Sequence, residues 1–232
     1  MGNLYLIRHG QASFGAENYD VLSPIGVRQA EWLGRFLNAS GIRLDCCVAG
    51  DLQRQRDTAQ HVLAMLAEAP PLILDPGFNE FDAQGLIRAL LPDLVLEVPE
   101  AYDVMRNAAH NPAQFQNLFE RLVDAWVGGQ GRGEACEPWP MFLRRVNDAL
   151  DRLVTSAQAG QNIAVFTSGG VIAAVLHRVT GLQATEAFRL NWQLYNSSLS
   201  HLRFRGTDIR LTSFNSHAHV LLADAPELIT WR

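Results

Sequence analysis

The sequence predicts an α/β protein with three layers, in which helices cover both faces of a mostly parallel sheet. Short apolar runs, of the length of buried strands, alternate along the chain with longer segments whose apolar residues recur at helical spacing. The chain has 232 residues, of which 48% are hydrophobic and 19% are charged. This length and composition suit a single well-buried domain over residues 1–232 and are far from those of a disordered chain.

The first strand–helix unit begins with a buried strand at residues 4–7. Ser23 is a typical helix N-cap residue, and Pro24 after it suits the first helical turn. The helix that follows presents one apolar stripe and stops before Gly41. A second unit pairs a strand at 46–49 with a helix that begins near Asp51. A further strand is expected at 72–74.

Residues from about 82 to 138 differ from the rest of the chain in composition and pattern, with several prolines and one clearly amphipathic helix that starts at Asn111-Pro112. We expect this stretch to be an inserted helical cap over the sheet edge that carries the site, a usual location for specificity elements. The glycine-rich run at 128–133 follows a helix and lacks the lysine of a phosphate loop, so we interpret it as a flexible linker.

The core pattern resumes after the cap. The expected elements are, in order, a helix from about 139, a strand at 163–166, a helix at 171–179, and a hairpin of strands at 199–204 and 209–214. Between the strand and the second of these helices, Thr167-Ser168-Gly169-Gly170 forms a tight strand-to-helix turn.

The charge and cysteine content exclude several classes of protein. The formal net charge of -5 and the absence of a Lys/Arg stripe argue against a nucleic-acid binder. The 3 cysteines form no C-x-x-C pair, so we expect neither a disulfide framework nor a zinc site. A signal peptide and a membrane span are not indicated. We therefore expect a cytoplasmic protein without a membrane or nucleic-acid partner, and the sequence leaves a homodimer open.

Arg8-His9-Gly10 stands directly after the first strand, and open α/β sheets bind ligands at the carboxyl ends of their strands. An imidazole can attack phosphorus to form a phosphohistidine, and a neighbouring guanidinium can hold the phosphoryl oxygens. We expect Gly10 to let the backbone pass close to the anion. These residues alone are a weak signal, since polar side chains often meet solvent at a strand end.

Read together with five later stretches, residues 4–10 resemble the signature of the histidine phosphatase superfamily, whose members are phosphoglycerate-mutase-like. The matching stretches, in chain order, are Leu22-Ser23-Pro24-x-Gly26-x-x-Gln29-Ala30, Asp51-Leu52-Gln53-Arg54-x-x-x-Thr58-Ala59, Asn79-Glu80 followed by Gly85, Trp139-x-x-Phe142-x-x-Arg145-Val146, and Asn215 with His219. They cover nearly the whole chain except the cap.

The resemblance implies that His9 is the nucleophile and that Arg8 and Arg54 bind phosphate. Arg56 is the rival of Arg54, but the spacing from Arg54 to Thr58 matches the family pattern and puts the two on one helix face.

The general acid implied by the resemblance is Glu80, with Asp82 as the reserve candidate. This role requires a carboxyl group with a raised pKa in a partly desolvated pocket.

The main departure from the family lies at Ser168, where a second histidine usually precedes the glycine. We expect Ser168 and Gly169 to bind phosphate, with a plain helix N-cap as the other role for Ser168, and the two glycines to offer backbone N–H groups to an anion. Because a serine never carries the positive charge, slow turnover is expected, and Ser168→His is expected to raise it. Ser13 stands in a second departure, at 12–15, and could compensate.

These residues predict a metal-independent phosphatase of small phosphomonoesters, acting through a phosphohistidine on His9 without a cofactor. The alternatives are a phosphoglycerate-type mutase and a catalytically weakened relative that binds a phosphorylated ligand or protein. His217 and His219 could be two metal ligands, but no third ligand is suggested, and a structural role is favoured.

Overall fold

The computed structural model describes residues 1–13, 20–108, 110–130 and 136–231. Within them, six strands form one sheet in the order β3-β2-β4-β1-β5-β6. The strands are β1 (Gly2–Arg8), β2 (Cys46–Ala49), β3 (Leu72–Leu74), β4 (Asn162–Thr167), β5 (Leu199–Arg205) and β6 (Asp208–Ser216). The pairs among β1 to β4 are parallel, whereas β5 is antiparallel to both β1 and β6. The predicted α/β fold is confirmed.

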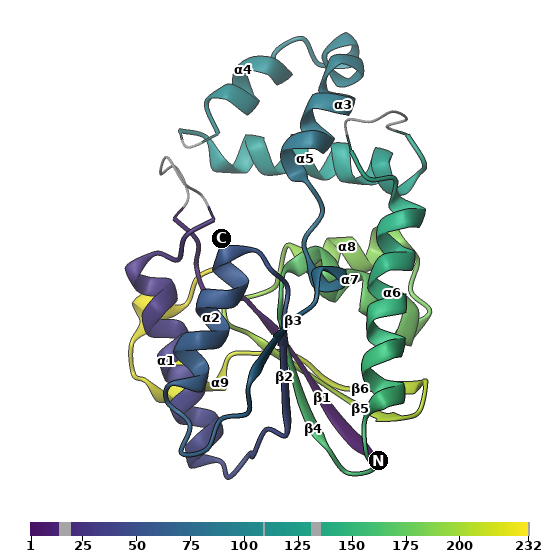
Figure 1. Cartoon of the computed structure of the whole chain (residues 1–232). Helices are drawn as coiled ribbons and strands as arrows, with labels where there is room; N and C mark the ends of the chain where they lie inside the picture. The colour runs from purple at the N-terminus through teal and green to yellow at the C-terminus, as the bar shows by residue number, and fades with distance from the viewer. Residues whose placement is uncertain (14–19, 109, 131–135, 232) are drawn as a thin grey trace.

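Helices cover both faces of this sheet, and a further group stands beyond its end (Figure 1). The helices are α1 (Pro24–Ala39), α2 (Gln53–Leu63), α3 (Ala83–Glu97), α4 (Ala101–Arg106), α5 (Pro112–Val127), α6 (Trp139–Ser156), α7 (Gly169–Thr180), α8 (Ala184–Asn191), α9 (Ala218–Leu222) and two short 3-10 helices, η1 (Pro76–Phe78) and η2 (Pro226–Leu228). In Figure 1, α1 and α2 lie on one side of the sheet and α6 on the other, while α3, α4 and α5, here called the cap helices, lie together above them.

Successive side chains of β1 point to opposite faces of the sheet, so its buried side chains belong to two apolar clusters. Tyr5 and Ile7 pack in the cluster that includes residues of α1 and α2. Leu4 and Leu6 belong to the larger cluster with α6, α7 and the cap helices. A strand buried on both faces is therefore apolar at consecutive positions, which is why residues 4–7 are recognisable as a central strand.

The expected elements of the core are confirmed. Ser23 caps α1, since its Oγ accepts a hydrogen bond from the Gly26 N–H at 3.1 Å, and Pro24 opens the helix. The helix expected at 171–179 begins earlier, at Gly169. The sequence pattern missed α3, α4, α8 and α9. Pro92 lies inside α3 and removes one helical hydrogen bond, but four leucines of this helix are buried, so packing overrides that loss.

In the described part of the chain, no helix is long and apolar enough to cross a membrane. The last part of the glycine-rich run, residues 131–133, lies outside the described residues. So do Phe14 and Gly15 of the departure at 12–15.

Candidate active site

Three parallel strands bring the predicted site residues to one sheet edge. Arg8, the last residue of β1, pairs with Thr167, the last residue of β4. The contact continues at the residue after Arg8, since the His9 N–H donates to the Thr167 carbonyl at 2.9 Å. On the other side of β4, β2 ends at Ala49 and leads into α2, which carries Arg54.

His9 is held in the form that can act as a nucleophile. Its side chain is buried, and its Nδ1 lies 2.8 Å from the Gly10 carbonyl, which can only accept a hydrogen bond. The proton therefore sits on Nδ1, and Nε2 keeps its lone pair. Burial lowers the pKa of His9 well below its usual value, and the Arg54 and Arg8 charges lower it further. The hydrogen bond with Gly10 raises this pKa and so opposes part of the shift. His9 is thus neutral at physiological pH.

Arg54 contacts His9 directly, because its Nε–H donates to His9 Nε2 at 3.3 Å. Its guanidinium also pairs with Asp20 at 2.6 Å, and this carboxylate further accepts from backbone N–H groups at the start of α2. Thr58 joins the two segments, since its Oγ1 accepts from the Gly10 N–H at 3.0 Å and donates to the Arg54 carbonyl at 2.6 Å. Arg56, the rival candidate, instead lines a groove beside β3.

Arg8 reaches the same cavity from the end of β1. Its guanidinium donates to the carbonyls of Leu194 and Trp231, the latter at 3.2 Å. The charges of Arg8 and Arg54 act on the pKa of both His9 and Glu80. All four side chains therefore lie within electrostatic reach of one another.

Glu80 lies in the same cavity at the N-terminus of α7. Its carboxylate accepts hydrogen bonds from the N–H groups of Gly170 at 2.9 Å and Phe81 at 3.2 Å. Burial of the carboxyl group raises the pKa of Glu80, and the Gly170 hydrogen bond and the Arg54 charge oppose this rise. A raised pKa is what a proton donor needs. The Gly170 N–H, which was expected to bind a substrate anion, therefore donates to Glu80.

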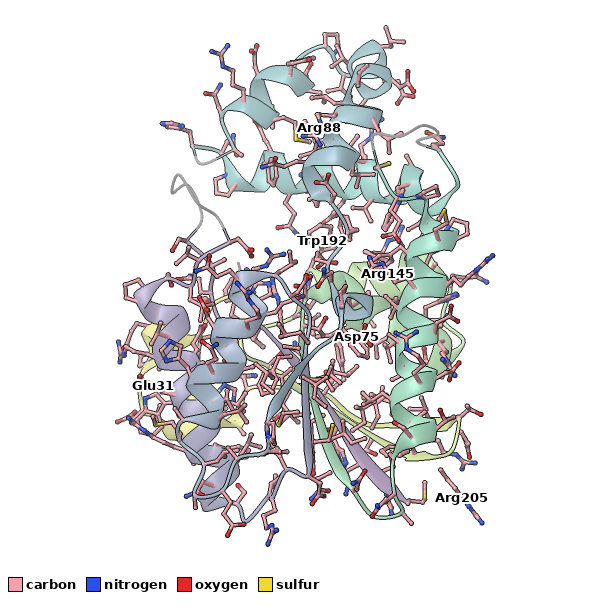
Figure 2. The ribbon with its side chains drawn as sticks, in the orientation of Figure 1. Glu31, Asp75, Arg88, Arg145, Trp192 and Arg205 are labelled. Carbon is pink, nitrogen blue, oxygen red and sulfur yellow. The ribbon has the colours of Figure 1, made fainter. Side chains whose placement is uncertain are left out.

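Asp82, the reserve candidate, lines the cavity but has structural partners. Its side chain accepts from the Gly85 N–H at 2.9 Å as the N-cap of α3, and it forms an exposed ion pair with Arg88. Figure 2 shows Arg88 among the cap helices.

Ser168, one of the predicted phosphate ligands, directly precedes Gly169 of the cavity wall but has other contacts. It is fully buried, it is not among the residues that line the cavity, and its side chain makes no helix-cap hydrogen bond. Instead, Gln55 Nε2 donates to Ser168 Oγ at 2.8 Å and to the Phe78 carbonyl at 3.2 Å. Since a carbonyl only accepts, the amide orientation of Gln55 is determined. Direct contact between Ser168 and phosphate is not supported by this geometry.

Two glycines of the site pack closely against other segments. A Cβ atom on Gly10 would lie 2.5 Å from the Gly26 carbonyl oxygen, so the approach of α1 alone requires a glycine there. A Cβ on Gly169, which lines the cavity, would lie 1.8 Å from the side-chain oxygen of Asn191.

The cavity has a volume of about 450 Å³. Its candidate phosphate-binding and catalytic residues are Arg8, His9, Arg54 and Glu80. The apolar part of the remaining wall comes from the residue before α2, the start of α3 with the segment before it, α5, and the residue after α8, through Leu52, Phe81, Ala83, Phe119 and Trp192. Asp82, Gln84, Gly169 and Asn191 complete the wall. Such a volume suits a small molecule.

Several residues of this site were not found from the sequence. Asp20, Gln55, Asn191 and Trp192 belong to no motif, and their roles depend on partners distant in the chain. The available signal for Gln55 was its position four residues before Ala59, on the buried face of α2.

The two candidate metal ligands have other contacts. His219 Nε2 lies 2.8 Å from Ser197 Oγ in the interior, and burial lowers the pKa of His219 to about 3. The ring of His217 packs on Tyr195, with 4.1 Å between centroids. Among the described residues, no group of three or more His, Cys, Asp or Glu side chains could hold a metal ion.

The fold and the arginine-flanked histidine are also found in a known superfamily of proteins. The model of the histidine phosphatase superfamily (branch 1) matches residues 4–217, and the chain belongs to this superfamily.

The individual relatives share about a quarter or less of their residues with this chain. The chain is 26% identical to a 2,3-bisphosphoglycerate-dependent phosphoglycerate mutase of Bartonella quintana, over 79% of this chain and 84% of the relative. It is 24% identical to a metal-independent phosphoserine phosphatase of Arabidopsis thaliana, over 94% and 82%. Among solved structures, a putative alpha-ribazole-5'-P phosphatase of Escherichia coli shares the fold, with a TM-score of 0.65, 22% identity, and coverage of 93% and 97%.

Proposed function

We propose that this protein is a phosphatase that hydrolyses a small phosphomonoester through a phosphohistidine on His9, without a metal ion. The observation that supports it best is the state of His9, a buried neutral imidazole whose Nε2 lone pair meets the Arg54 guanidinium. Arg8 and Glu80 line the same cavity. These four side chains supply a nucleophile, two phosphate ligands and an acid.

In the first step, His9 Nε2 attacks phosphorus while the bond from phosphorus to the ester oxygen breaks. Glu80 gives its proton to the leaving oxygen, so the alcohol departs neutral. Arg8 and Arg54 bind the phosphoryl oxygens, and their positive charge stabilises the negative charge of the transition state. The Gly10 carbonyl accepts a hydrogen bond from His9 Nδ1–H, so it stabilises the cationic phosphohistidine.

In the second step, the Glu80 carboxylate takes a proton from a water molecule, whose oxygen attacks the same phosphorus atom. The phosphorus–nitrogen bond breaks and its electron pair returns to Nε2. Inorganic phosphate leaves, His9 is neutral again, and Glu80 is protonated for the next cycle. The sum of the two steps is ester plus water to alcohol plus phosphate.

The wall charges favour this phosphatase over a phosphoglycerate-type mutase. A phosphoglycerate carries a carboxylate besides its phosphate. Among the described residues that line the cavity, Arg8 and Arg54 are the cations, and both serve the phosphoryl group. Incubation with 3-phosphoglycerate decides between the two, because a mutase would form the 2-isomer and a phosphatase would not.

The direct test is hydrolysis of p-nitrophenyl phosphate in the presence of a chelator. We expect turnover, inhibition by vanadate, and loss of activity in His9→Ala. His201→Gln is a matched control, because His201 lies on β5 outside the cavity. Full activity in His9→Ala would exclude the covalent mechanism.

The buried Ser168 favours one second candidate, a weakened relative that binds phosphate without turnover, because no second histidine strengthens the site. Tight vanadate or phosphate binding with no hydrolysis of any ester would support that candidate over the phosphatase.

A further inference from the structure

The part of the cavity beyond the phosphate-binding residues is aromatic. Phe119 of α5 and Trp192, which follows α8, both line it and are both half-buried. Their rings meet edge to face, with 5.8 Å between centroids and an interplanar angle of 77°. Figure 2 shows Trp192 between the cap helices and the body of the molecule. An aromatic surface therefore faces the space next to the phosphoryl site.

The aromatic rings of the wall have further aromatic contacts. Phe119 also stacks on Phe115 with 5.7 Å between centroids, and Phe81, which lines the same cavity, packs on Trp126 at 4.8 Å. A wall whose side chains are already ordered loses little conformational entropy on binding, which favours affinity.

The charge of the wall restricts the rest of the substrate. Apart from Arg8 and Arg54, the described lining residues include no cation, and Asp82 adds a negative charge. A second anionic group of a substrate would lose hydration without gaining a cationic partner, which is costly in free energy. It would also lie near the Asp82 carboxylate, which repels it. Asn191 and Gln84 are neutral polar groups that can bond hydroxyl groups.

We infer that the substrate is the phosphate monoester of an uncharged alcohol that carries an aromatic ring, and that this ring packs against Trp192 and Phe119. The inference rests on the proposed phosphatase function and adds the class of the alcohol. Phosphorylated hydroxy acids and bisphosphates are the classes that the wall excludes.

The test compares three esters with alkoxide leaving groups, so that leaving-group chemistry differs little: benzyl phosphate, glycerol 3-phosphate and 3-phosphoglycerate. We expect kcat/KM to fall in that order, with at least about a tenfold difference between the first and the last. Equal values, or a preference for 3-phosphoglycerate, would overturn the inference while leaving the phosphatase proposal intact. No hydrolysis of any ester would instead contradict the phosphatase proposal.

Variants of Trp192 connect the preference to the wall. Trp192→Ala is expected to lower kcat/KM for benzyl phosphate about tenfold and that for glycerol 3-phosphate by a clearly smaller factor. Trp192→Phe keeps a ring and is expected to retain most of the preference. Tyr102→Ala is the control, because Tyr102 is an exposed cap residue outside the cavity. An equal loss on both esters in Trp192→Ala would contradict ring packing.

Discussion

At the residue scale, the environments of His9 and Glu80 suit the tasks of nucleophile and acid that we propose for them. Burial and two neighbouring arginines lower the pKa of His9, whereas burial raises the pKa of Glu80. The first shift favours the neutral imidazole and the second favours the protonated carboxyl group, which are the forms that the first step requires.

Replacement of the acid should separate Glu80 from Asp82. Glu80→Gln is expected to lower kcat/KM, which reports the first step, about 10²–10⁴-fold on benzyl phosphate, because its alkoxide leaves poorly without a proton. The loss of kcat/KM should be much smaller on p-nitrophenyl phosphate, whose phenolate leaves unaided. Asp82→Asn is the matched variant and should retain activity on both esters. The reverse pattern would assign the acid to Asp82.

Gln55 changes the expectation for Ser168→His. Gln55 Nε2 lies 2.8 Å from Ser168 Oγ and both residues are fully buried, so an imidazole at 168 would need the space that the Gln55 amide occupies. We now expect Ser168→His alone to lower kcat, and Gln55→Ala combined with it to recover activity.

A double-mutant cycle of kcat measures this coupling between Gln55 and Ser168, which should reach about 1 kcal/mol or more. A functional histidine at 168 should also add an ionisation to the pH profile of the double variant. Additive effects of the two substitutions would show that Gln55 does not occupy the histidine position.

At the scale of elements, Arg145 of α6 connects three segments near the acid. It forms a two-point ion pair with Glu137, and its Nη1 donates to the carbonyls of Pro76, Gly77 and Asn79 at 3.0, 3.2 and 3.1 Å. The last of these carbonyls directly precedes Glu80. Figure 2 shows Arg145 beside α6. The helix therefore determines the course of the segment that presents the acid.

Arg145→Ala is expected to lower the free energy of unfolding by about 3 kcal/mol, because it leaves the half-buried Glu137 without its partner. It should also reduce kcat/KM more on benzyl phosphate than on p-nitrophenyl phosphate, since Glu80 is displaced. Arg152→Ala is the control on the same helix, where an exposed ion pair with Asp75 contributes little. Equal destabilisation in both variants, measured by urea unfolding, would contradict this role.

Sequence patterns identified elements whose own residues carry the signal. The strands of the core and α1, α2, α5 and α6 have apolar runs, stripes or caps of their own. In contrast, α3 contains Pro92, and α8 and α9 are short, so their helical state depends on tertiary packing.

The candidate site divides in the same way. The motifs contain Arg8, His9, Arg54 and Glu80, whereas Trp192 and Gln55 become relevant only when distant segments meet.

At the scale of the whole molecule, the segment before β5 and the C-terminal segment complete the site. The Ser197 N–H donates to the His9 carbonyl at 3.1 Å, and Ser197 in turn contacts His219 of α9. Asn215 holds the preceding turn through hydrogen bonds with Tyr195 and Gln193. The C-terminal Asn-x-x-x-His element therefore supports the nucleophile from behind, a role that its sequence position alone did not show.

This architecture should make the fold sensitive to acid. Burial keeps His219 neutral in the native state, with a pKa of about 3, whereas the unfolded chain binds a proton near pH 6.5. The unfolded state binds more protons below pH 6.5, so stability falls as the pH falls through that value. At pH 5 the loss from His219 should be about 2 kcal/mol.

Urea unfolding at pH 7 and pH 5, compared between the wild type and His219→Gln, isolates the contribution of His219 to the loss of stability. Glutamine keeps a hydrogen-bonding group for Ser197 but does not titrate. The wild type should lose about 2 kcal/mol more than the variant between the two pH values. An equal loss would show that His219 does not contribute to acid sensitivity.

The most direct test of the proposed function is to locate the transferred phosphoryl group. The wild-type protein is mixed with a radiolabelled phosphomonoester, quenched within the first turnovers under alkaline conditions, and digested for peptide mapping. We expect an alkali-stable, acid-labile label on the peptide that contains His9, and none in His9→Ala. A label on another residue, or turnover at the wild-type rate in His9→Ala, would contradict the assignment of His9 as the nucleophile.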